Sequence, residues 1–129
     1  MDKRELTAFA LEARENSYSP YSSFKVGAAL LAENGKVYCG CNIENAAYSP
    51  TNCAERTAFF TAIADGARGF EAIAVVGGKD EIDSFCLPCG MCRQVMSEFC
   101  DKNFRIYTYD GEEIRTYTLG ELLPESFKL

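Results

Sequence analysis

Two short segments of the chain carry residue types that bind metals and move protons. Cys53 and Glu55 stand two positions apart, and Pro88 precedes a Cys-x-x-Cys pair formed by Cys89 and Cys92. Three thiolates can hold a zinc ion with its fourth position left for water, whose pKa falls to about 7 in well-studied zinc sites. A carboxylate beside such a water can accept its proton and pass it on. The segments therefore predict a catalytic zinc site with Glu55 as the proton carrier.

The composition narrows this chemistry further. The chain has seven cysteines and no histidine, which excludes Ser-His-Asp and Cys-His nucleophilic mechanisms and every metal site built on imidazole. Three thiolates also place three negative charges around a divalent ion. Arg56, directly after Glu55, is expected to offset part of that charge.

Other interpretations of the cysteines remain open at this point. A Cys-x-x-Cys pair alone is also typical of redox proteins. Cys86, Cys89 and Cys92 share the spacing of a ferredoxin cluster run, but Met96 stands where the fourth cysteine of that run would fall. Cys86 could instead complete a closed, structural four-cysteine zinc site. Glu55 favours the open site, because a closed site has no position for a water molecule whose proton this carboxylate could accept.

The remaining composition points to a small neutral ligand in a reducing compartment. The net charge is −6 and no run of Lys or Arg occurs, so binding to a nucleic-acid backbone is not expected. The mixed charges of the N-terminus do not resemble a signal peptide, and no stretch has the roughly 18 apolar residues of a membrane span. We therefore expect a cytoplasmic protein with reduced thiols. Free cysteines are often buried, so Cys39, Cys41 and Cys100 are predicted to be packing residues.

The elements that position these residues follow from hydrophobic periodicity. Helical spacing predicts a helix over about residues 2–16, and Asn34-Gly35 predicts a hairpin turn between two strands. Together the expected elements are helices at 2–16, 53–65 and from 89 onward, strands at 24–31, 37–42, 72–77, 104–109 and 114–118, and a short helix within 119–124. This α-β-β-α-β-α-β-β order predicts one α/β domain over residues 1–129, with three layers (α/β/α) around a five-stranded mixed sheet. Cys53 and Cys89 each fall at a helix start, where backbone N–H groups and the helix dipole stabilise a thiolate.

The motifs also carry a family resemblance. Residues 42–48 (NIENAAY), 53–56 (CAER) and 88–94 (PCGMCRQ) make the chain similar to the small, homotetrameric, zinc-dependent cytidine deaminases, over a region from about residue 21 to residue 124. The resemblance implies the cytidine-deaminase-like fold and one Zn²⁺ per chain. It also implies the hydrolysis of cytidine, and of 2′-deoxycytidine, to uridine or deoxyuridine and ammonia in pyrimidine salvage, with Glu55 as proton shuttle.

The resemblance further implies a set of substrate contacts. Phe24 would stack on the pyrimidine ring, and Asn42 and Glu44 would bind the ribose hydroxyls. The backbone of Ala54 and Cys89 would contact the base edge and the amino group, while Tyr48 and Phe127 would reach the sites of neighbouring subunits. A homotetramer with shared sites and a nucleoside substrate is therefore expected. Two alternatives are a deaminase of a cytosine-nucleoside antibiotic and a non-catalytic domain with a closed four-cysteine zinc.

Overall fold

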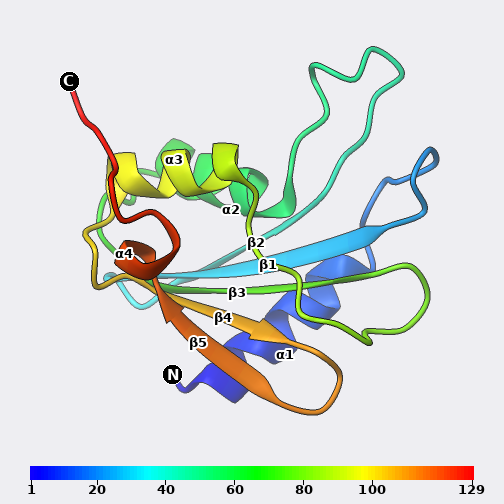
Figure 1. Cartoon of the computed structure of the whole chain (residues 1–129), viewed down its shortest axis with the longest axis horizontal. Helices are drawn as coiled ribbons and strands as arrows, with labels where there is room; N and C mark the ends of the chain where they lie inside the picture. Colours follow the sequence, from blue (N-terminus) through cyan, green and yellow to red (C-terminus); the bar gives the residue numbers. More distant parts are fainter.

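The computed structural model describes all 129 residues, and the helices and strands follow one another in the predicted order (Figure 1). No helix in it is both long enough and apolar enough to cross a membrane. The elements are α1 (Lys3–Arg14), β1 (Lys25–Ala32), β2 (Val37–Cys41), α2 (Ala54–Ala64), β3 (Phe70–Gly78), α3 (Gly90–Phe99), β4 (Arg105–Tyr109), β5 (Ile114–Thr118) and α4 (Leu119–Leu122).

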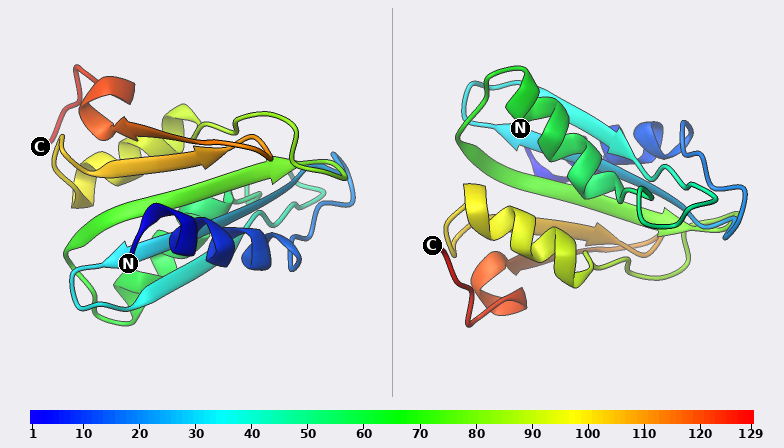
Figure 2. Two further views of the ribbon diagram at one scale, coloured as in Figure 1. Left: turned by 90° about the horizontal axis from the view of Figure 1, so that it is seen from below. Right: turned by 90° about the horizontal axis from the view of Figure 1, so that it is seen from above.

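The five strands form one mixed sheet in the order β2-β1-β3-β4-β5. Only β3 and β4 run parallel, and α3 lies in the connection between them; the other neighbours are antiparallel. Helix α1 covers one face of the sheet, while α2 and α3 lie side by side on the other face, as the two views of Figure 2 show. The prediction of a three-layer α/β/α fold with a five-stranded mixed sheet is confirmed.

The two faces of β3 explain why its sequence is apolar without alternation. Ile73 and Val75 belong to the cluster under α2 and α3, whereas Ala72, Ala74 and Val76 pack beneath α1. Successive side chains of a strand point to opposite faces, so a strand covered on both sides is apolar at every position. Strand β3 therefore lies between the two helix layers, with β1 paired to it on one side and β4 on the other.

The helices that carry the predicted ligands begin one residue later than the sequence indicates. Cys53 is the N-cap of α2 and Cys89 is the N-cap of α3, both in extended backbone conformation. Neither side chain makes a capping hydrogen bond, so both sulfurs are free to ligate a metal. The cysteines thus stand where the helix dipoles favour negative charge.

The prediction that the other cysteines are packing residues is wrong for one of them. Cys100 is buried at the end of α3 and Cys41 is half-buried, but Cys39 is exposed. Cys39 lies on β2 at the edge of the sheet, and only part of α1 lies near its side chain. Burial statistics for cysteine do not account for an edge strand, where one side lacks a neighbour.

Candidate active site

Three sulfur atoms meet where the first turns of α2 and α3 converge. The Sγ atoms of Cys53, Cys89 and Cys92 all lie within 4.8 Å of one another. The distance from Cys89 Sγ is 3.8 Å to Cys53 Sγ and 3.6 Å to Cys92 Sγ. Tetrahedral zinc with Zn–S bonds of about 2.3 Å places its sulfur ligands about 3.8 Å apart. The spacing of these sulfurs therefore fits zinc.

The protonation of these thiols shows why the group suits a cation. Hydrogen bonding to Cys92, together with the nearby Arg56, lowers the pKa of Cys53 well below its usual value. The same contact with Cys53, together with burial, raises the pKa of Cys92 well above its usual value. One thiolate thus forms at the expense of its neighbour. A divalent ion between the sulfurs would remove this conflict, because it favours ionisation of all three thiols.

Arg56 lies against the sulfur group rather than in solvent. Its Nη2 donates a hydrogen bond to Cys53 Sγ at 3.1 Å, and its Nε is buried without a partner. The structure thus places the guanidinium where the sequence predicts a positive charge to offset the thiolates.

Glu55 lies in the first turn of α2 and is only 4% exposed. It lines a cavity of about 230 Å³ together with Cys53 and Cys89, so Glu55 and two of the three predicted metal ligands border one space. Burial is the main cause that raises the pKa of Glu55 to about 7. A carboxyl group with such a pKa can both accept and release a proton near neutral pH.

Cys86 lies outside the ligand group. Its Sγ packs against Gly77, where a Cβ atom on the glycine would lie only 2.7 Å from the sulfur. Burial raises the pKa of Cys86 to about 12. Thr108 on β4 fixes the backbone of Cys86: its Oγ1 accepts from the N–H and donates to the carbonyl, both at 3.1 Å. The sequence reasoning missed Thr108, because nothing in the motifs points to β4. The geometry gives no support to a closed four-cysteine site.

The predicted ribose contacts Asn42 and Glu44 line the same cavity as Glu55, and so does Ala54. Each polar side chain also holds a neighbouring segment. Asn42 Oδ1 accepts from the Val26 N–H at 2.9 Å, and Asn42 Nδ2 donates to the Phe24 carbonyl at 2.7 Å. Asn42 therefore fixes the start of β1, a task that the sequence does not reveal.

The Glu44 carboxylate is held in a similar way by the loop before β1. It accepts hydrogen bonds from the backbone N–H groups of Tyr21 (2.9 Å) and Ser22 (3.1 Å), and from the Ser22 hydroxyl. These bonds, above all the one from the Ser22 hydroxyl, lower the pKa of Glu44. Glu44 is thus an ionised acceptor in a fixed position.

None of the three predicted aromatic contacts lines the Glu55 cavity within one chain. Phe24 is half-buried against Gly77, and it lines a neighbouring cavity of about 590 Å³ beside the segment after β3. Tyr48 is 74% exposed in the loop that projects beyond β2, and Phe127 is 65% exposed in the C-terminal tail (Figure 1). Within one chain, neither Tyr48 nor Phe127 lines the Glu55 cavity.

Arg93 is a further residue that the sequence reasoning did not single out. Its Nε donates to the Pro88 carbonyl at 2.8 Å, and its Nη1 donates to the Leu122 carbonyl at 2.9 Å. Arg93 therefore ties the start of α3, where two of the predicted metal ligands lie, to α4. The only feature of the sequence that could have indicated this role is the position of Arg93 directly after Cys92.

The comparisons with known proteins agree with this site. A family model described as the cytidine and deoxycytidylate deaminase zinc-binding region matches residues 1–108. A cytidine deaminase of Sporosarcina psychrophila is 53% identical over 98% of this chain and 92% of its own length, and one of Halalkalibacterium halodurans is 48% identical over 98% and 95%. The crystal structure of cytidine deaminase from Burkholderia pseudomallei superposes with a TM-score of 0.91 at 47% identity, covering 98% of this chain and all of the other.

The chain therefore belongs to the cytidine and deoxycytidylate deaminase zinc-binding family. The resemblance inferred from the motifs is confirmed, and so is the prediction of zinc as the cofactor.

The composition of the ligand group can be tested by metal content. We expect Cys53→Ala and Cys92→Ala to lose zinc after desalting, because each removes one of three ligands, whereas Cys86→Ser should keep one zinc per chain. Cys39→Ala is the matched control, since Cys39 is exposed and distant from the group. Loss of zinc from Cys86→Ser alongside full zinc in Cys39→Ala would show that Cys86 is a fourth ligand.

The contribution of Arg56 can be measured as zinc affinity. Removing a hydrogen-bond donor to a metal ligand typically weakens binding about tenfold or more, so Arg56→Gln should release zinc to a chelator at about a tenfold lower chelator concentration. Arg68→Gln is the control, because Arg68 donates only to the backbone carbonyls of Ile63 and Ala67. Equal zinc affinity in both variants would contradict the charge-balancing role.

Proposed function

We propose that this chain catalyses the hydrolytic deamination of cytidine, and of 2′-deoxycytidine, to uridine or deoxyuridine and ammonia, as part of pyrimidine salvage. The observation that carries the proposal is the buried Glu55 carboxyl, which shares one cavity with the Cys53 and Cys89 ligands. The nearly full-length relatives that are named cytidine deaminases support the choice of substrate. A bound zinc ion supplies Lewis acidity that lowers the pKa of water at this site.

In this proposal Glu55 carries every proton. It accepts a proton from the attacking water and delivers it to N3 of the cytosine ring, which makes C4 electrophilic. After the hydroxyl oxygen has bonded to C4, Glu55 transfers the second proton of that water to the departing amino group. The C4–N bond breaks, ammonia leaves and C4 becomes a carbonyl carbon. The buried position of Glu55 suits this exchange, because burial raises its pKa to about 7.

The nucleoside would be held by residues of the Glu55 cavity, and by Phe24 from the cavity that it lines beside the segment after β3. Asn42 and Glu44 offer a fixed amide and an ionised carboxylate to the ribose hydroxyls. The backbone of Ala54, at the start of α2, would meet the base edge, and Phe24 would stack on the ring. The fixed ribose contacts favour a plain nucleoside over a modified antibiotic nucleoside.

We also propose a homotetramer, in which Tyr48 and Phe127 of neighbouring subunits close each pocket. Both side chains are largely exposed in one chain, so both are available to contact a neighbouring subunit. The thiolate ligands require a reducing compartment, so we place the enzyme in the cytoplasm. The net charge of −6 suits a neutral nucleoside better than a polynucleotide.

The proton-carrying role can be tested with Glu55→Gln. This variant keeps the shape of the side chain but cannot shuttle protons, so turnover of cytidine, followed by the loss of its absorbance, should fall by at least about 10²-fold while zinc stays bound. Glu71→Gln, on an exposed position of β3, is the control and should be fully active. Full activity of zinc-loaded Glu55→Gln would refute the mechanism, and wild-type turnover of a cytosine-nucleoside antibiotic but not cytidine would refute the substrate.

The shared pocket can be tested by mixing subunits. Tyr48→Ala and Glu55→Gln should each be impaired as pure proteins, the first in KM and the second in kcat. If Tyr48 acts on a neighbour's site, mixed tetramers formed by mild dissociation and reassociation will contain sites with both native residues. The specific activity of the mixture should then exceed the average of its components. An activity equal to that average would contradict a shared site.

A further inference from the structure

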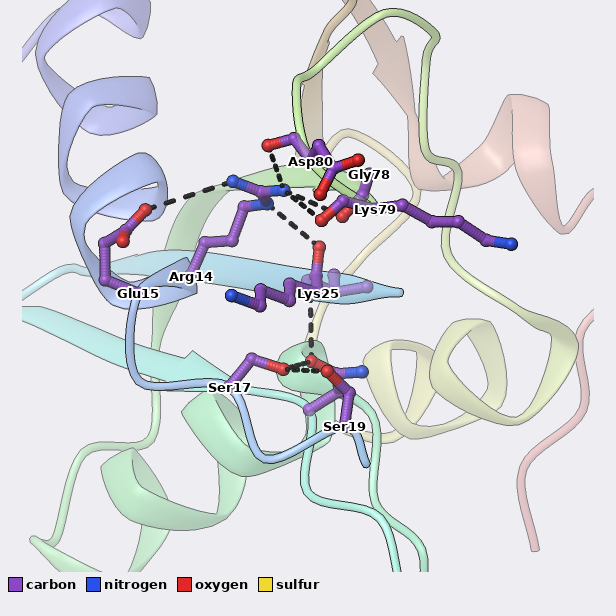
Figure 3. A network of polar contacts seen from close by, with 10 residues as sticks. Arg14, Glu15, Ser17, Ser19, Lys25, Gly78, Lys79 and Asp80 are labelled. Carbon is purple, nitrogen blue, oxygen red and sulfur yellow. Dashed lines mark hydrogen bonds and ion pairs between the residues drawn. The ribbon is translucent and has the colours of Figure 1, made fainter. Parts of the chain in front are cut away.

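Arg14, at the C-terminal end of α1, is a buried cation held by backbone carbonyls. It is 7% exposed, and its nearest carboxylate is that of the exposed Glu15 at 3.9 Å. Its guanidinium donates instead to four carbonyl oxygens: Lys25 (3.1 Å), Gly78 (2.8 Å), Lys79 (3.3 Å) and Asp80 (3.0 Å). Figure 3 shows this fan of contacts. A buried charge is costly unless such bonds compensate it, so the position of Arg14 requires these four carbonyls.

The four carbonyls belong to segments that lead into the site. Lys25 is the first residue of β1, and Gly78 is the last residue of β3 and its register partner. Lys79 and Asp80 open the segment of residues 79–89, which ends at the metal ligand Cys89. Arg14 therefore fastens two strand ends and the start of this segment to one helix.

A second set of hydrogen bonds, from the Asn42 side chain, holds the residues on either side of Lys25. The Asn42 side chain accepts from the Val26 N–H and donates to the Phe24 carbonyl. Residues 24–26 are thus held between Asn42, which lines the Glu55 cavity, and Arg14, whose helix lies on the opposite face of the sheet. Asn42 Oδ1 also accepts from the Ser17 hydroxyl, and Figure 3 shows Ser17 and Ser19 on the side of Lys25 away from Arg14.

We propose that Arg14 is a positioning residue of the nucleoside site, acting from the far face of the sheet through the backbone of residues 24–26 and 78–80. This inference rests on the proposed function. Phe24, whose ring would stack on the base, lines a cavity with Gly78, Lys79 and Asp80. Arg14 donates hydrogen bonds to the backbone carbonyls of all three. Arg14 has no contact with the metal ligands, so its loss should loosen substrate placement and leave proton transfer intact.

A purely structural role would predict a different result, and Leu6 provides the comparison. Leu6 lies on the same helix and is 1% exposed in the cluster beneath α1. Leu6→Ala therefore loosens α1 while every Arg14 contact to residues 25 and 78–80 remains available. Any effect caused only by a weakened α1 should appear in Leu6→Ala as well.

The experiment uses zinc-loaded full-length protein and the variants Arg14→Met, Arg14→Lys and Leu6→Ala. Arg14→Met should raise KM for cytidine about tenfold with kcat changed less than about twofold and one zinc per chain. Arg14→Lys should recover part of the loss, since one ammonium can reach some of the carbonyls but not all four. At assay temperatures below the melting temperature of the variant, Leu6→Ala should have the same KM as the wild type. If Arg14→Met does not fold, the KM of Arg14→Lys against that of Leu6→Ala decides.

Amide hydrogen exchange without nucleoside separates this inference from the proposed function. Arg14→Met and Arg14→Lys should exchange faster than wild type in peptides covering residues 22–26 and 78–84, and Leu6→Ala should not show this pattern. Wild-type exchange in those peptides, or an equal rise of KM in Leu6→Ala, would overturn the positioning role. A different outcome is faster exchange in the Arg14 variants together with a wild-type protein that does not turn over cytidine. That outcome would refute the proposed function but would still show that Arg14 holds residues 24–26 and 78–80.

Discussion

Three thiols whose sulfurs lie within 4.8 Å cannot all ionise unless positive charge stands among them, and this constraint governs the structure around the site. Two helices begin at the group, so that their dipoles and free N–H groups face the sulfurs. Arg56 adds a full positive charge at 3.1 Å from Cys53. Zinc completes this balance, and the fold can be understood as the means of bringing two helix starts together.

The sheet makes this convergence possible. Helices α2 and α3 both lie on the face of the sheet opposite α1, and the parallel crossover from β3 to β4 returns α3 to the side of α2. Small residues such as Ala54, Ala58 and Ala62 let α2 lie close to the strands. The same packing buries Glu55 and thereby raises its pKa, so both Glu55 and the cluster of three sulfurs depend on where α2 begins.

The sequence predicts the elements, the layers and the cysteine cluster that could bind a metal, because each has a local signature. Cys53 and Cys89 precede helical periodicity, Asn34-Gly35 marks the hairpin, and an unbroken apolar run marks β3. The residues that sequence reasoning missed act through the backbone of distant segments. Thr108 holds Cys86 from 22 positions away, and Arg14 holds Gly78 from 64 positions away. Such contacts have no spacing rule, because tertiary packing alone decides which carbonyl meets which donor.

The proposed mechanism depends on an open zinc site with three sulfur ligands beside Glu55. A zinc K-edge X-ray absorption spectrum of the zinc-loaded protein measures it directly. We expect three sulfur neighbours at about 2.3 Å and one oxygen at about 2.0 Å, the oxygen being that of water. Four sulfur neighbours and no oxygen would contradict it, because zinc would then have no position for water and Glu55 no proton to accept.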